Sequence, residues 1–181
     1  TGEIYKKVRA YKERFAETPE ARRSLIRIPV ARPLQTLPAQ LPIDPYLYGY
    51  WLGNGCANKP CITIRTEDVE EVLSHIPYET HNRYPQKCGG SDVVYFDELQ
   101  DILVPTFRDK RIRSEYLRAS EAQRWRLLQG LVDSDGSIGE RKAQSTYTST
   151  IRQLALDVRE LLWSLGIKNA MTEGPSLRYG K

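Results

Sequence analysis

The sequence has little that would point to a secreted or membrane-bound protein. Its three cysteines, Cys56, Cys61 and Cys88, are an odd number and form no paired disulfide framework. It has no signal peptide, no apolar run long enough to span a membrane and no lipidation site. We therefore expect a soluble protein that is intracellular and cytoplasmic and has no membrane partner.

Side chains that bind zinc are also scarce. The two histidines, His75 and His81, could be combined with Cys56 and Cys61, but the spacing fits no common zinc pattern. The sequence therefore does not favour a zinc site.

The net charge of +4 is modest for 181 residues and is unevenly distributed. Residues 1–32 hold nine Lys and Arg against four Glu, a net +5, which leaves residues 33–181 at eighteen against nineteen, a net −1. Proline-punctuated, extended chain continues to Pro42. We predict that residues 1–42 are a basic segment with a linker and that a domain begins at residue 43.

A nine-residue pattern occurs twice. Residues 47–55 (LYGYWLGNG) and 128–136 (LQGLVDSDG) share Leu first, Gly third, a small residue seventh and Gly ninth. Each is an apolar stretch typical of a helix, and the ninth-place glycines predict left-handed C-terminal caps. The eighth places differ, because the first copy has Asn54 and the second has Asp135.

The small residues of both copies predict a close contact between the two helices. Places three and seven lie on one helical face, which brings together Gly49, Gly53, Gly130 and Ser134. Two helices that pack this closely and end together would place their eighth residues side by side. A carboxylate beside the negative ends of two helices is favourable where a divalent cation neutralises it. The pattern therefore predicts a metal site at Asp135.

These motifs resemble those of the LAGLIDADG homing endonucleases, also called the dodecapeptide type. The resemblance covers roughly residues 43–181 and implies an α+β fold with saddle-shaped antiparallel sheets. Two αββαββα halves related by a pseudo-twofold axis, residues 43–118 and 119–181, would pack through the two motif helices. The second half would be incomplete at its C-terminus.

The resemblance also implies a function. The chain would be a site-specific, Mg²⁺-dependent DNA endonuclease domain of the two-metal type, encoded within an intein. It would act as a monomer on double-stranded DNA with a long, asymmetric target site. An intein splicing domain would be its partner in the parent protein, and residues 1–42 would be a possible remnant of that domain.

Candidate site residues follow from the resemblance, position by position. Asp135 is the expected metal ligand, Asn54 occupies the place of its partner, and Lys110 matches the basic residue near a scissile phosphate. The backbone carbonyls of Gly53 and Ser134 are further candidate ligands. Polar residues on the expected strands would either contact DNA or form a solvated sheet face, namely Thr63, Arg65, Arg141, Lys142, Gln144, Ser145, Tyr147 and Ser149.

Asn54 leaves alternatives open. An amide oxygen brings no charge to a Mg²⁺ site, so we expect an impaired nuclease or one that nicks a single strand. The alternatives are a degenerate DNA-binding module without cleavage activity, and a structural remnant of an intein that no longer contacts DNA. Asp133, at the sixth place, aligns with Leu52 and is expected to lie at the helix contact rather than to bind metal.

Alternation and helical spacing predict the remaining elements. We expect a helix that is closed by Gly166 over 150–165, a helix over 67–75, a hairpin over 137–148, and strands over 61–65, 92–96 and 169–173.

Overall fold

A computed structural model describes residues 6, 9, 31–56, 58–79, 82–87, 89–96, 100, 109–139 and 144–175. The chain divides into two compact units, Thr1–Ala31 and Arg32–Lys181, and every element named below belongs to the second. Among the described residues, no helix combines the length and apolarity needed to cross a membrane.

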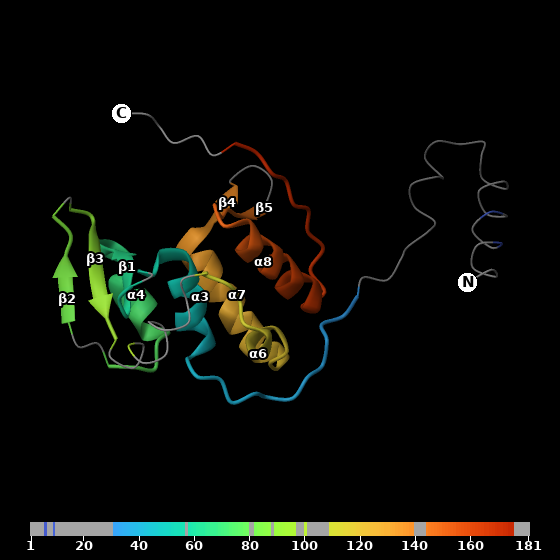
Figure 1. Ribbon diagram of the computed structural model, residues 1–181, viewed down its shortest axis with the longest axis horizontal. Helices are drawn as coiled ribbons and strands as arrows, with labels where there is room; N and C mark the ends of the chain where they lie inside the picture. The colour runs from blue at the N-terminus through green and yellow to red at the C-terminus, as the bar shows by residue number, and fades with distance from the viewer. Residues whose placement is uncertain are drawn as a thin grey trace. The chain divides into compact units, whose positions relative to one another are not determined.

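Two helices lie side by side at the centre of the second unit (Figure 1). They are α3 (Pro45–Asn54) and α7 (Glu121–Asp135). Asp44 caps α3 by accepting hydrogen bonds from two backbone N–H groups of its first turn. Ser120 and Gln123 form a reciprocal capping box at the start of α7. Both helices therefore begin where local sequence signals place them.

A three-stranded antiparallel sheet follows α3. Its order is β1-β3-β2, with Ile62 opposite Val94. A 3₁₀ turn and a short helix connect β1 to β2. The bounds are β1 (Cys61–Arg65), η1 (Thr66–Asp68), α4 (Val69–Ser74), β2 (Asn82–Pro85) and β3 (Ser91–Tyr95).

A smaller sheet follows α7. It has two antiparallel strands, with Ser137 opposite Thr146, and a longer helix comes after it. The bounds of these elements, and of the short helix before α7, are α6 (Ser114–Leu117), β4 (Gly136–Gly139), β5 (Gln144–Tyr147) and α8 (Arg152–Ser164). The protein thus has the predicted mixture of helices and small antiparallel sheets.

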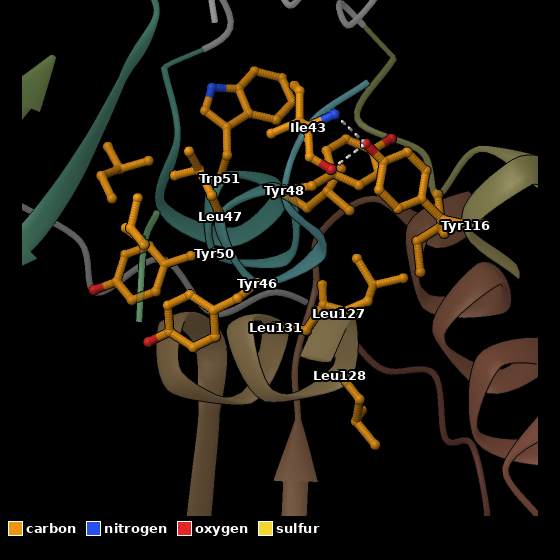
Figure 2. Packing of buried hydrophobic residues seen from close by; sticks show 14 of the residues in the cluster. Ile43, Tyr46, Leu47, Tyr48, Tyr50, Trp51, Tyr116, Leu127, Leu128 and Leu131 are labelled. Carbon is orange, nitrogen blue, oxygen red and sulfur yellow. Dashed lines mark hydrogen bonds between the residues drawn. The ribbon is translucent and has the colours of Figure 1, made fainter. Parts of the chain in front are cut away.

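The core surrounds α3. Residues 46–52 of this helix are all buried. Ile62 and Ile64 of β1 are fully buried beside it, and the Tyr116 hydroxyl donates to the Ile43 carbonyl at 3.0 Å and accepts from its N–H at 3.1 Å (Figure 2). A helix buried on every face cannot be moved without disturbing the whole unit.

The two motif helices do not end as predicted. Gly55 and Gly136 have φ values of −83° and −87°, so the expected left-handed caps are wrong. Glycine is required at these places by space, because a Cβ on Gly136 would lie 2.7 Å from Val132 Cγ1 and one on Gly55 would overlap the Trp51 indole. Gly166, with φ +73°, closes α8 in the left-handed conformation as predicted.

The strand predicted over residues 169–173 is also wrong. This stretch has no regular secondary structure, and the described part of β5 pairs only with β4. A strand needs a neighbouring strand for its hydrogen bonds. The Arg152 guanidinium instead pairs with Glu173 at 3.0 Å and holds the stretch beside α8.

The segment before α3 is hydrogen-bonded to the second half. The Leu34 N–H donates to the Ser164 carbonyl at 2.9 Å, and the Thr36 hydroxyl donates to the Ala119 carbonyl at 2.6 Å. Arg124, which is fully buried, donates to the carbonyls of Leu34, Ser164 and Ala119. The predicted domain boundary at residue 42 remains a prediction.

Candidate functional site

At Gly49 and Gly130, the contact between α3 and α7 is made by main-chain atoms. A Cβ on Gly49 would overlap the Leu127 carbonyl oxygen and lie 3.0 Å from the Leu131 nitrogen. A Cβ on Gly130 would overlap the carbonyl oxygen of Tyr46. Figure 2 shows Leu127 and Leu131 of α7 beneath α3. Any side chain larger than a hydrogen atom is therefore excluded at Gly49 and at Gly130.

The two helices end at the same place. A Cβ on Gly53 would lie 2.7 Å from Ser134 Cβ and 3.1 Å from Asp135 Cγ. The Asn54 amide donates from Nδ2 to the Ser134 carbonyl at 3.3 Å. The structure therefore brings both seventh-place and both eighth-place residues together.

Lys110 extends its side chain into this end of the helix pair. Its Nζ donates to the Gly53 carbonyl at 3.1 Å and lies 5.5 Å from the centre of the Trp51 ring. An ammonium here interacts favourably with the negative C-terminal end of α3. Burial lowers the pKa of Lys110, and the charge of Asp135 opposes that shift.

Lys110 also has an unusual backbone conformation. Its φ is +35°, and among the described residues it alone of the non-glycine residues has a positive φ. This conformation costs roughly 1–3 kcal/mol and is retained only where surrounding contacts impose it.

Asp135 is half-buried beside the ammonium. Burial raises the pKa of its carboxyl group, and the Lys110 charge opposes the rise. Among the described residues, none donates a hydrogen bond to this carboxylate. Tyr147 lies close enough for Asp135 to raise its pKa, after the larger effect of burial, and an interaction with the Ser149 side chain opposes the rise.

The oxygen atoms here suit a hard cation. The Asp135 carboxylate, the Asn54 amide oxygen and the carbonyls of Gly53 and Ser134 are the ligand types that Mg²⁺ prefers. No group of three or more His, Cys, Asp or Glu side chains with metal-binding geometry occurs within the described residues. These donor atoms are therefore of the types that would bind one divalent ion at Asp135. The expected two-metal arrangement would need a second carboxylate, and there is none among these residues.

The predicted DNA-contacting residues are dispersed over both sheets. Thr63 and Arg65 lie on one face of β1, opposite the buried Ile62 and Ile64. The Arg65 side chain is 69% exposed and pairs with Glu67 at 2.9 Å. Ser145 on β5 is exposed, Gln144 begins the same strand, and the Ser149 hydroxyl accepts from the Ile151 N–H. Arg141 and Lys142 lie outside the described residues.

Asp133 is directed toward α3. It is exposed, and its carboxylate accepts a hydrogen bond from the Tyr46 hydroxyl at 3.0 Å. This bond crosses from α7 to the first turn of α3, one helical turn or more away from the end that holds Asn54. Asp133 therefore contacts the other motif helix and not the candidate metal ligands.

Two residues near the site, Asp157 and Arg111, were not singled out from the sequence. Asp157 on α8 is 4% exposed and accepts hydrogen bonds from Arg111, the neighbour of Lys110. The available signal was a charged residue within the apolar stripe of α8, between Leu154 and Leu161. A carboxylate at such a position must have partners.

Comparison with known proteins assigns part of the chain to a family. Residues 122–180, which include the second nine-residue motif, match the model of the LAGLIDADG-like domain. This part of the chain is a LAGLIDADG-like domain. LAGLIDADG domains bind DNA and are generally nucleases, and the endonucleases among them typically use divalent metal ions.

The chain that contains this LAGLIDADG-like domain is also similar to a much longer protein. It is 33% identical over 138 residues to the replicative DNA helicase DnaB of Mycobacterium intracellulare. The match covers 76% of the chain and 22% of the helicase, so the chain spans only about a fifth of that relative's length.

Proposed function

We propose that this chain is the site-specific DNA endonuclease domain of an intein, and that Asn54 impairs its hydrolysis of phosphodiesters. The observation that carries the proposal is the convergence of Asp135, Asn54 and Lys110 at the shared end of α3 and α7. In this proposal the domain is a monomer with two pseudo-twofold-related halves and saddle-shaped sheets.

Each residue at the convergence has a chemical role in the proposal. Asp135 would hold a divalent ion together with the Asn54 amide oxygen and the carbonyls of Gly53 and Ser134. Mg²⁺ in such a site supplies an activated water and offsets negative charge on the phosphate. Lys110 donates hydrogen bonds from its ammonium to a phosphate oxygen as negative charge develops there.

Asn54 limits the reaction on one strand. Its amide carries no charge, so Asp135 is the single carboxylate among the proposed ligands. Cutting both strands of DNA would need a charged ligand for each strand. Cleavage of one strand at Asp135 with little cleavage of the other is the expected outcome. The chain would then release nicked rather than linear DNA.

DNA would lie along the outer faces of the two sheets. Thr63, Arg65, Arg141, Lys142, Gln144, Ser145, Tyr147 and Ser149 are the candidate contacts to bases and phosphates. Because the sheets have different sequences and sizes, the target would be long and asymmetric. The net charge of −1 over residues 33–181 predicts modest affinity. Contacts from Lys and Arg side chains to phosphates would still make DNA binding steeply dependent on salt.

An intein explains the similarity to part of a helicase. If an intein that carries an endonuclease interrupts a replicative helicase, a nuclease domain is expected to match only part of that helicase. This chain matches 22% of the helicase sequence. In the proposal, residues 1–42 derive from the splicing domain, which is the partner in the parent protein. The domain would act inside the cell, where its DNA target is.

One observation favours a second function, DNA binding without cleavage. The Gly53 and Ser134 carbonyls already accept hydrogen bonds from Lys110 and Asn54, so a cation would have to compete for both. Binding of DNA without any strand cleavage, with and without metal, would support this alternative. Absence of DNA binding at low salt would instead favour a structural remnant.

A plasmid assay distinguishes these functions. Supercoiled plasmids that carry a library of candidate insertion sites are incubated with Mg²⁺ and then with Mn²⁺. The chain is compared with its Asn54→Asp variant and with Asn58→Asp, a control that adds the same charge at an exposed position outside the nine-residue motif. Nicked circles from the original chain and linear DNA from Asn54→Asp alone are the expected results. No product from any variant would overturn the endonuclease function.

A further inference from the structure

The residue after Lys110 is restrained from two sides. The Arg111 guanidinium donates to Asp157 from Nε at 3.3 Å and from Nη2 at 3.1 Å, and the Ile112 N–H donates to the same carboxylate at 3.0 Å. On the other side, the Tyr48 hydroxyl donates to the Arg111 carbonyl at 2.6 Å. The backbone next to Lys110 is therefore fixed between α8 and α3.

Asp157 is built into the protein interior for these bonds. It is 4% exposed, and the Gln153 side chain donates to it at 3.0 Å. A buried carboxylate that accepts four hydrogen bonds, two of them from a guanidinium, holds its donors in one geometry. Because α8 belongs to the second half and Lys110 follows the sheet of the first, the restraint joins the two halves at the site.

The restraint accounts for the conformation of Lys110. A φ of +35° is unfavourable for a lysine and persists only when its neighbours impose it. If residues 111 and 112 were released, the backbone of Lys110 would relax toward negative φ. Its ammonium would then leave the Gly53 carbonyl and the neighbourhood of Asp135.

We propose that Asp157 is a positioning residue that acts through Arg111 and Ile112 to hold the Lys110 ammonium at the end of the α3–α7 pair. It does not touch DNA or metal itself. The part of this inference that concerns catalysis rests on the proposed endonuclease function, but the positioning of Lys110 does not.

The first test measures the reactivity of the Lys110 amine in the whole chain without DNA. Limited acetylation with acetic anhydride is followed by mass spectrometry, with the exposed Lys59 and Lys168 as internal references. We expect acetylation of Lys110 to rise about 10-fold in Asp157→Asn as the site opens locally, with no change at the references. Arg111→Gln, which alters a side chain that is 54% exposed, should give a similar rise if Asp157→Asn fails to fold.

The matched control is Arg118→Gln. Arg118 also pairs with a carboxylate on α8, Glu160, at 3.4 Å, but it is eight residues from Lys110 and makes no contact with residues 110–112 among the described contacts. Its substitution should leave the acetylation of Lys110 unchanged. Equal acetylation of Lys110 in the original chain and in Arg111→Gln would overturn the proposal.

The second test is a double-mutant cycle in the Asn54→Asp background. Arg111→Gln should reduce the single-turnover cleavage rate about 10-fold without changing the DNA Kd, and should have no further effect when Lys110 is already alanine. An equal slowing in the Lys110→Ala background, or a weaker Kd with an unchanged rate, would contradict positioning through Lys110. A rise in acetylation in a chain that cuts no DNA would support the positioning and reject the endonuclease function.

Discussion

The two repeats of this chain contribute unequally to the buried core and to the candidate site. The first has α3, which is buried on every face, and a three-stranded sheet, but it ends in the amide of Asn54. The second has α7, which is partly exposed, and a two-stranded sheet, but it ends in the carboxylate of Asp135. Neither half contains a complete site, so the comparison teaches that the candidate chemistry depends on the contact between them.

The halves also differ in how they are attached. Buried residues of both halves form one hydrophobic cluster, but the start of α7 is also tied by Arg124 to the segment before α3 and to the end of α8. Substitutions that affect one half and spare the other can test this difference.

The largest effect is expected from Arg124→Ala. This fully buried guanidinium donates to three backbone carbonyls, and all three bonds would be lost together. The carbonyls of Ser164 and Ala119 would keep the bonds from Leu34 and Thr36. We expect the free energy of unfolding to fall by about 4 kcal/mol, as measured by urea denaturation. Arg118→Ala, at a side chain that is 70% exposed, should change it by less than about 0.5 kcal/mol. A small loss in Arg124→Ala would mean that the second half is held by other contacts.

The second-largest loss of stability is expected from Gly130→Ala. Its methyl group would overlap the Tyr46 carbonyl and lie 2.8 Å from the Tyr50 nitrogen, so the two halves would be forced apart. We expect a loss of about 3 kcal/mol in the free energy of unfolding. Gly174→Ala is the control, because a Cβ there meets no atom within 4 Å. Equal stabilities for the two variants would show that the helices do not pack through their backbones.

The third prediction concerns the two carboxylates of α7 and is measured in the Asn54→Asp background. Asp135→Asn should slow single-turnover cleavage about 100-fold, because it removes the charged ligand of the proposed ion. Asp133→Asn should slow it much less, because Asp133 accepts a hydrogen bond from Tyr46 instead. The reverse order of effects would move the metal site to Asp133.

The smallest effect is expected in the sheet of the first half. The hydrogen bond from Arg83 to Asp92 holds the pKa of that carboxyl group below its ordinary value. A lowered pKa means that the carboxylate stabilises the fold above about pH 4 and loses this contribution as the pH falls through the folded-state pKa. Asp92→Asn should therefore lower the Tm at pH 7 and differ less from the original chain near pH 3. A difference that grows toward acid pH would contradict this assignment.

Local signals in the sequence predicted much of the fold. The two apolar nine-residue motifs, the alternation of residues 61–65 and the helical spacing of residues 150–165 each specify an element within a few residues. The spacing of Gly49, Gly53, Gly130 and Ser134 predicted a close helix pair, and these residues do lie in that contact.

Features that depend on distant neighbours could not be predicted in this way. Residues 169–173 were expected to form a strand but have no strand beside them in the described part of the chain, and Gly55 is a glycine because Trp51 lies against it. The bond between Arg111 and Asp157 joins residues 46 apart, and only the folded chain shows that they meet. The assignments of Asp135, Asn54 and Lys110 to catalysis remain predictions.

The backbone contact between α3 and α7 also bears on how such a domain can diverge. A slide of one helix by a single residue would turn its side chains by about 100° and separate the two eighth-place residues. Since the contact depends on main-chain atoms and small residues, its register is insensitive to side-chain rotamers elsewhere. Strand residues such as Thr63 and Arg65 can therefore be exchanged, which would change the DNA sequence that they are proposed to contact, while Asn54 and Asp135 keep their alignment.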